Sequence, residues 1–127
     1  MNNTLQMRLH AIMLRVTNLE RSRKWYTETL GFTVAFEDSH YKLLTLRDQG
    51  EGQLAIWELR PGEIPTVATQ EAAYPVFIST HASEDHRLLA ARGANPEPIQ
   101  DYPHGLRVFW VSDPDGHRIC VLEFMME

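Results

Sequence analysis

Two stretches of the chain, "DQGEGQLAIWEL" at residues 48–59 and "DPDGHRICVLEF" at residues 113–124, align with each other without a gap. Each runs from a turn built of Asp, Gly and polar residues into an apolar strand. The alignment places Ala55 on Cys120 and Glu58 on Glu123. Self-similarity of this kind indicates that the chain repeats one supersecondary unit.

The first half of the chain has the pattern strand, helix, strand, strand, strand. Thr17 and Glu20 have the spacing of a capping box at the helix start, and Gly31 suits the helix end. The helix has one largely apolar face, formed by Leu19, Ser22, Tyr26 and Leu30. We expect these elements at residues 9–16, 17–31, 32–38, 41–48 and 53–60.

The second half repeats this pattern after a stretch rich in Pro, Gly and small polar residues, which indicates a linker at about 61–73. Its helix should begin at Ser83 as N-cap and end at Gly93. Its strands are expected at 74–80, 106–113 and 118–125, with one short strand within 93–105. The sequence therefore predicts a single α+β domain over residues 1–127, made of two βαβββ modules at about 8–60 and 74–125. Their paired sheets should form a curved mixed sheet around a cavity.

Composition and charge exclude several classes of partner. The 127-residue chain has a formal net charge of −5, whereas nucleic-acid binding favours basic patches. The acidic balance weakly favours a cationic ligand. We expect no membrane span and no signal peptide. A single cysteine cannot form an internal disulfide, so a reducing cytoplasm is the expected location.

Two motifs resemble the vicinal oxygen chelate superfamily, which groups glyoxalase I, extradiol dioxygenases, fosfomycin-resistance enzymes and bleomycin-resistance proteins. They are "LRVTNLERSRKWYTETLGF" in the first half and "VFWVSDPDGHRICVLE" in the second. The likeness extends from about residue 8 to residue 124. It implies a homodimer with cavities near the subunit interface. In the enzymes of the superfamily, it also implies one divalent metal held by His and Glu side chains.

The four metal-ligand positions of that superfamily fall on Ala11, Ala55, Tyr74 and Cys120. Alanine has no donor atom, and a tyrosine with a cysteine makes a poor site for a hard metal. We therefore expect no metal cofactor, as in the bleomycin-resistance branch. A one-residue slip of the first strand would bring His10 into the cavity as a fallback ligand. It would also turn Ile12, Leu14 and Val16 away from the helix, which disfavours it.

Strand alternation predicts which side chains line the cavity. Tyr74 occupies one of the superfamily's metal-ligand positions, and Trp57, two residues after Ala55, lies on the same face of its strand. Phe109 and Trp110 are consecutive, so only one of them can face the cavity. The predicted ligand-binding residues are Met13, Arg15, Ala55, Trp57, Tyr74, Phe109, Cys120 and Leu122. Small side chains beside aromatic ones would shape an apolar, stacking pocket.

Two classes of function follow. The first is metal-independent binding or sequestration of a small aromatic or cationic molecule, and the absent metal quartet favours it. The second is a glyoxalase-like lyase or ring-cleaving dioxygenase with a non-standard metal site. No catalytic residue is assigned. Glu58 and Glu123, at matching strand ends, are either solvated edge charges or a paired acid and base.

Overall fold

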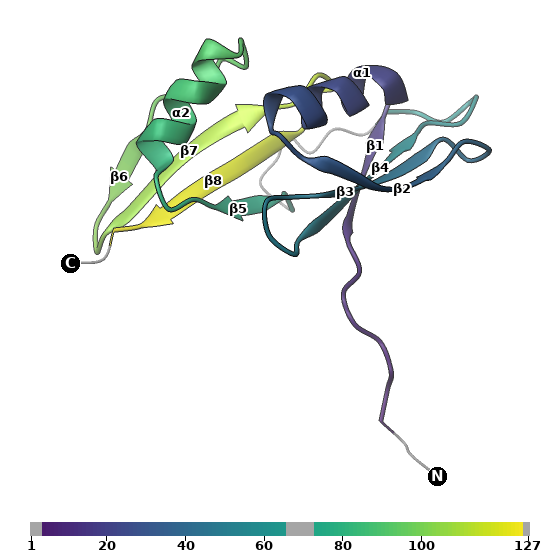
Figure 1. Ribbon diagram of the computed structural model, residues 1–127, viewed down its shortest axis with the longest axis horizontal. Coiled ribbons are helices and arrows are strands. Elements are labelled where there is room, and N and C mark those ends of the chain that lie inside the picture. The colour runs from purple at the N-terminus through teal and green to yellow at the C-terminus, as the bar shows by residue number, and fades with distance from the viewer. Residues whose placement is uncertain (1–3, 66–72, 126–127) are drawn as a thin grey trace.

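The computed structural model describes residues 4–65 and 73–125, which form two modules of the same topology (Figure 1). The first contains β1 (Ile12–Val16), α1 (Leu19–Lys24), the π-helical turn η1 (Trp25–Thr29), β2 (Thr33–Asp38), β3 (Leu43–Arg47) and β4 (Gln53–Glu58). The second contains β5 (Val76–Ile78), α2 (Ala82–Ala91), β6 (Gln100–Tyr102), β7 (Leu106–Ser112) and β8 (Arg118–Phe124). The α+β fold with two βαβββ modules is confirmed. The predicted linker at 61–73 falls in part on residues 66–72, which lie outside the described residues.

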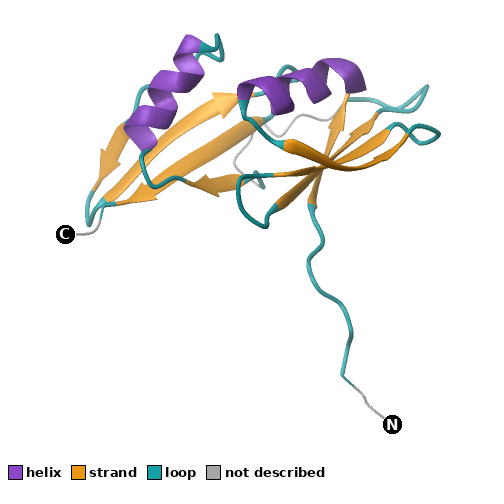
Figure 2. Ribbon diagram, in the orientation of Figure 1, coloured by secondary structure: helices purple, strands orange, loops and turns teal. Residues whose placement is uncertain are grey.

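Each module has one four-stranded mixed sheet, with the strand orders β1-β4-β3-β2 and β5-β8-β7-β6. The strands β1 and β4 are parallel, as are β5 and β8. Met13 pairs with Ala55, and Val76 pairs with Cys120, so the sequence repeat aligns equivalent positions of the two sheets. Both helices cover the same side of the sheets, and the other side carries no helix (Figure 2).

The apolar core lies between the helices and the sheets. From β1 it takes Leu14 and Val16, which are buried, so this strand has the register that the sequence predicted. The apolar helix face is confirmed, because Leu19, Ser22 and Tyr26 are buried and Leu30 packs against the core. Arranged this way, the sheets present Met13 and Arg15 on the side away from the helices.

The helix starts differ from the predicted ones. Asn18 caps α1, with its side chain accepting a hydrogen bond from the Arg21 N–H at 2.9 Å, so the capping box at Thr17 was wrong. The Thr17 hydroxyl instead donates a hydrogen bond to Asp115, in the turn at residues 113–117, at 2.6 Å. His81, with no side-chain cap bond, occupies the N-cap position of α2, where Ser83 was predicted.

The strands β1, β3 and β5 are each three or four residues shorter than predicted. The strand β1 begins at Ile12, and residues 4–11 extend away from the body on the side opposite the helices (Figure 1). The strand β5 spans only Val76–Ile78. Among the described residues, no helix is long and apolar enough to cross a membrane.

Candidate ligand-binding face

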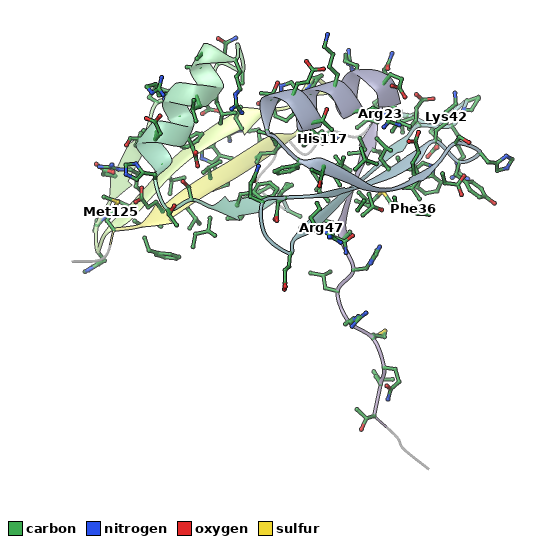
Figure 3. All side chains as sticks on the ribbon, in the orientation of Figure 1. Arg23, Phe36, Lys42, Arg47, His117 and Met125 are labelled. Carbon is green, nitrogen blue, oxygen red and sulfur yellow. The ribbon has the colours of Figure 1, made fainter. Side chains whose placement is uncertain are left out.

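One face of the first sheet, on the side away from the helices, brings four of the predicted site residues together. Cross-strand pairing sets Met13 beside Ala55 and Arg15 beside Trp57. Paired residues in neighbouring strands project to the same side of a sheet, so all four share this face. Figure 3 shows Phe36 and Arg47 on the side of the sheet opposite α1 as well.

The second sheet supplies the remaining predicted residues, with one exception. Cys120 and Leu122 lie two apart in β8 and share its face away from α2, while Trp110 is the cross-strand partner of Cys120. Tyr74, just before β5, makes an edge-on contact with Trp110, with ring centroids 4.8 Å apart. We use the term ligand face for the helix-free sides of both sheets.

Phe109 lies on the opposite side from its predicted position. Its cross-strand partner is Val121, a core residue, and its side chain is fully buried beneath α2. The His86 ring meets it edge-on at a centroid distance of 5.1 Å. Because neighbouring residues of a strand alternate between faces, Trp110 rather than Phe109 reaches the ligand face.

An arginine stacks on the Trp57 ring. The Arg15 Cζ atom lies 4.2 Å from the ring centroid, and the Arg60 Cζ lies 5.2 Å away. Glu63 holds the Arg15 guanidinium through two hydrogen bonds, of 2.9 and 2.7 Å. These bonds, and those from Arg60, lower the pKa of Glu63 to about 2. The indole face is therefore a planar platform already occupied by a planar cation.

The second sheet repeats this arrangement with different residues. The Arg118 Cζ atom lies 4.2 Å from the Trp110 ring centroid, and the guanidinium donates to both carboxylate oxygens of Glu97 at 3.0 Å. Sequence reasoning did not single out Arg118, Glu63 or Glu97. Arg118 could have been found by parity, since it lies two residues before Cys120 on the same strand.

The superfamily's metal does not fit the residues present. Of its four ligand positions, Ala11 and Ala55 carry no donor. Burial raises the pKa of the Cys120 thiol, which opposes the thiolate form that binds metals. His10 is exposed and lies before β1 begins. Among the described residues, no group of three or more His, Cys, Asp or Glu side chains could hold a metal ion.

Glu58 and Glu123, at equivalent positions of the two modules, each accept a hydrogen bond from the start of a helix. The Glu58 carboxylate accepts a hydrogen bond from the Leu19 N–H at 2.9 Å, and the Glu123 carboxylate accepts one from the Ala82 N–H at 2.9 Å. Leu19 and Ala82 are the first residues of α1 and α2. The Leu19 N–H, and then Lys42, lower the pKa of Glu58. Each carboxylate thus caps the helix of its own module.

The turn at residues 113–117 joins the two modules, and we call this contact the closed junction. Buried Asp113 accepts a hydrogen bond from the Tyr26 hydroxyl at 2.8 Å. The neighbouring Asp115 accepts from the N–H and the hydroxyl of Thr17, at 3.0 and 2.6 Å. His117 is hydrogen-bonded to the Arg15 carbonyl at 2.8 Å, so the turn also contacts β1.

Comparison with known proteins identifies the family and the fold. Residues 8–121 match the family model described as Glyoxalase/Bleomycin resistance protein/Dioxygenase superfamily. A solved member of that superfamily from Sphaerobacter thermophilus DSM 20745 is 26% identical, with a TM-score of 0.76 over 92% of this chain and 97% of that chain. No curated protein matches the sequence.

Two further solved structures share the fold at lower similarity. TioX from Micromonospora sp. ML1 is 25% identical, with a TM-score of 0.69 over 92% of this chain and 99% of that chain. TnmS3, an antibiotic binding protein from Streptomyces sp. CB03234, is 22% identical, with a TM-score of 0.73 over 94% of this chain and 98% of that chain.

Proposed function

The chain belongs to the Glyoxalase/Bleomycin resistance protein/Dioxygenase superfamily, and from this premise we propose that it binds a planar aromatic small molecule without a metal. The observation that carries the proposal is the pair of tryptophan platforms on the ligand face, each covered by an arginine. An aromatic ring can stack where the guanidinium now lies, since both are planar and both are attracted to the indole face. The fold is also that of a protein described as antibiotic binding.

The local charge favours a neutral or acidic aromatic ligand over a cationic one. Although the chain as a whole carries −5, three arginines surround the two platforms, namely Arg15, Arg60 and Arg118. Two glutamates, Glu63 and Glu97, pair with them. A cationic ligand would add like charge to guanidinium groups already stacked on the rings. An acidic group could take over their hydrogen bonds instead.

We further propose that the ligand face is completed by a second copy of the chain. Large apolar side chains are exposed on that side of both sheets, including Phe36, Ile78 and Phe124, whose exposed fractions are 55%, 70% and 57%. Exposed apolar patches of this kind are typical of protein interfaces. Light scattering after gel filtration tests this directly, and a monomer at micromolar concentration would contradict it.

Titration of intrinsic tryptophan fluorescence tests the ligand proposal. The probes are anthraquinone-2-sulfonate, a planar tricyclic anion, and proflavine, a planar tricyclic cation of similar size. We expect the anion to bind more tightly and Trp57→Ala to weaken its binding at least about tenfold, the loss of one buried stacking contact. Trp25→Phe, a change on the helix side, is the matched control and should bind as the unchanged protein does.

Two results would overturn the proposal. One is unchanged affinity in both Trp57→Ala and Trp110→Ala, since the ligand would then lie elsewhere. The other is stoichiometric metal in the purified protein together with probe binding that a chelator abolishes. The first result would reject the platforms, and the second would favour the lyase or dioxygenase class.

A further inference from the structure

A hollow lies between the two modules, largely on the helix side, and the edge strand β5 borders it with Val76, Phe77 and Ile78. Its volume is about 720 Å³, which is within the usual range for sites that bind small molecules. It is bounded by the end of η1, the turn at residues 48–52, β5 and α2. Among its apolar lining residues are Phe32, Leu88, Leu89, Val111 and Ile119.

This hollow stands where a second closed junction would be expected from the repeat. The turn at 48–52 is equivalent to the turn at 113–117 that forms the closed junction, and it faces Thr80 and α2 across the hollow. Gly50 stands at the position of Asp115, so no carboxylate is offered to Thr80. The part of α2 equivalent to Tyr26 carries Leu88 and Leu89, which have no hydroxyl for Asp48. The turn therefore leaves the apolar lining open.

The rim of the hollow is acidic. Three carboxylates line it, from Asp48, Glu51 and Asp85, against the single guanidinium of Arg92. That guanidinium donates to a neutral group, the Thr29 carbonyl, at 2.7 Å, and so does not cancel a rim carboxylate by direct pairing. An apolar interior below an anionic rim is complementary to a molecule with an aliphatic body and a positive end.

We propose that this hollow is a second binding site, which takes an aliphatic ammonium ion. The alkyl chain lies on Phe32, Leu89 and Ile119, and the ammonium group meets the carboxylates of Asp48, Glu51 and Asp85. The site shares no residue with the tryptophan platforms. Stacking on the tryptophan platforms and binding in this hollow can therefore fail separately, although Ile78 borders the hollow and also lies on the ligand face.

The test uses octylammonium as the probe, with octanoate and octan-1-ol as probes of equal chain length. Binding is followed by amide chemical shifts of the isotope-labelled full chain at neutral pH. We expect octylammonium to shift residues of the 48–52 turn and of α2, octan-1-ol to bind several-fold more weakly, and octanoate to bind weakest. Shifts confined to the ligand face would overturn the proposal, as would equal binding of octanoate and octylammonium.

Four variants sharpen the result. Glu51→Gln should weaken octylammonium about three- to tenfold, whereas Glu84→Gln, the same charge change on α2 outside the hollow, should not. Leu88→Trp should fill the hollow and abolish binding, with circular dichroism and thermal unfolding confirming that the variant is folded. Unchanged affinity in Glu51→Gln together with Leu88→Trp would overturn the site. Trp57→Ala should leave octylammonium binding unchanged, and a loss there would assign the probe to the ligand face.

Discussion

The turns at 113–117 and 48–52 share one backbone conformation, but only the first makes contacts with the other module. In the first, Asp113 accepts from the N–H groups of Asp115 and His117, at 3.0 and 2.9 Å. In the second, Asp48 accepts from those of Gly50 and Gly52, at 2.7 and 3.1 Å. Both aspartates also donate their own N–H to the carbonyl four residues later, at 3.0 Å. The turns therefore fold alike, and only their outer side chains differ.

The contact between the modules therefore depends on a few side chains rather than on the repeated backbone. Asp115 and His117 reach Thr17 and the Arg15 carbonyl, whereas glycines at the equivalent positions reach nothing across the gap. A packed junction and an open hollow thus arise from the same architecture.

Asp113→Ala should produce the largest effect. It removes the acceptor for the buried Tyr26 hydroxyl and for two turn amides. We expect a loss of about 3 kcal/mol in the free energy of unfolding, because a buried hydroxyl is left without a partner. Asp48→Ala removes only the two turn amide bonds at a more exposed site and should cost about 1 kcal/mol. Urea unfolding at neutral pH measures both, and equal losses would contradict the asymmetry.

Tyr26→Phe should cost about 1.5 kcal/mol and also change the response to alkali. Burial, and then the charge of Asp113, raises the pKa of Tyr26 well above 10.0. The folded state therefore keeps a proton that the unfolded chain releases. The stability that this proton contributes is complete below the ordinary pKa of tyrosine and is lost as the pH rises above it.

Unfolding measured between about pH 9 and about pH 11.5 should therefore show a fall in stability that is smaller in Tyr26→Phe. Tyr41→Phe, which removes the hydroxyl of an exposed tyrosine, is the matched control. An alkaline slope that is identical in Tyr26→Phe and the unchanged protein would reject this role for the buried hydroxyl.

Glu58→Ala and Glu123→Ala test the helix-capping carboxylates, in which the two modules are alike. Each removes the acceptor for the first N–H of a helix, so each should cost about 1 kcal/mol. The conservative changes to Gln keep an acceptor and should cost less. Because the pKa of Glu58 is lowered, its contribution is present above its ordinary pKa of 4.5 and is lost as the pH falls below that value. Thermal unfolding of the four variants compares them, and a much larger loss in one module would show that the caps are not equivalent.

A reciprocal exchange of Gly50 and Asp115 should give the smallest change on the open side. Asp115→Gly removes both bonds to Thr17 and should cost about 1 kcal/mol. Gly50→Asp should alter stability by no more than about 0.5 kcal/mol, since the new carboxylate can reach only the exposed Thr80 and Asp48 still meets no hydroxyl on Leu88 or Leu89. A Cβ atom at Gly50 would meet only the Asp48 carboxylate, at 3.5 Å, so the substitution fits. A gain above about 1 kcal/mol in urea unfolding would mean that one carboxylate alone closes the junction.

The repeat made the fold predictable from the sequence. The side-chain contacts between the two modules were not predictable. Gapless alignment of the two turn-strand stretches placed Ala55 and Cys120 at equivalent register positions, which the sheet pairings confirm. The bond between Tyr26 and Asp113 joins residues 87 apart, and local periodicity carries no signal for such a contact. For the same reason the capping box at Thr17 was wrong, because Asp115 competes for that hydroxyl.

The candidate site was predictable where the alternation of side chains along a strand could be counted from a position of known direction. Arg15 and Trp57 followed from their spacing to Met13 and Ala55, and the structure places them together. Phe109 was misplaced because a strand with apolar residues on both faces gives no local sign of which one turns inward. Glu63 and Glu97 lie outside the strands, where sequence pattern does not fix side-chain direction.

The π-helical turn at Trp25–Thr29 has a consequence at the level of the gene. Gly31 lies twelve residues after the start of α1, whereas Gly93 lies eleven residues after the start of α2. A π turn accommodates one extra residue without breaking the helix. The two halves of the reading frame therefore differ here by one codon, and the fold absorbs it where Tyr26 is positioned. Deletion of a single codon upstream of Tyr26, within the helix, would rotate the Tyr26 hydroxyl away from Asp113 and remove one of the hydrogen bonds that join the two modules.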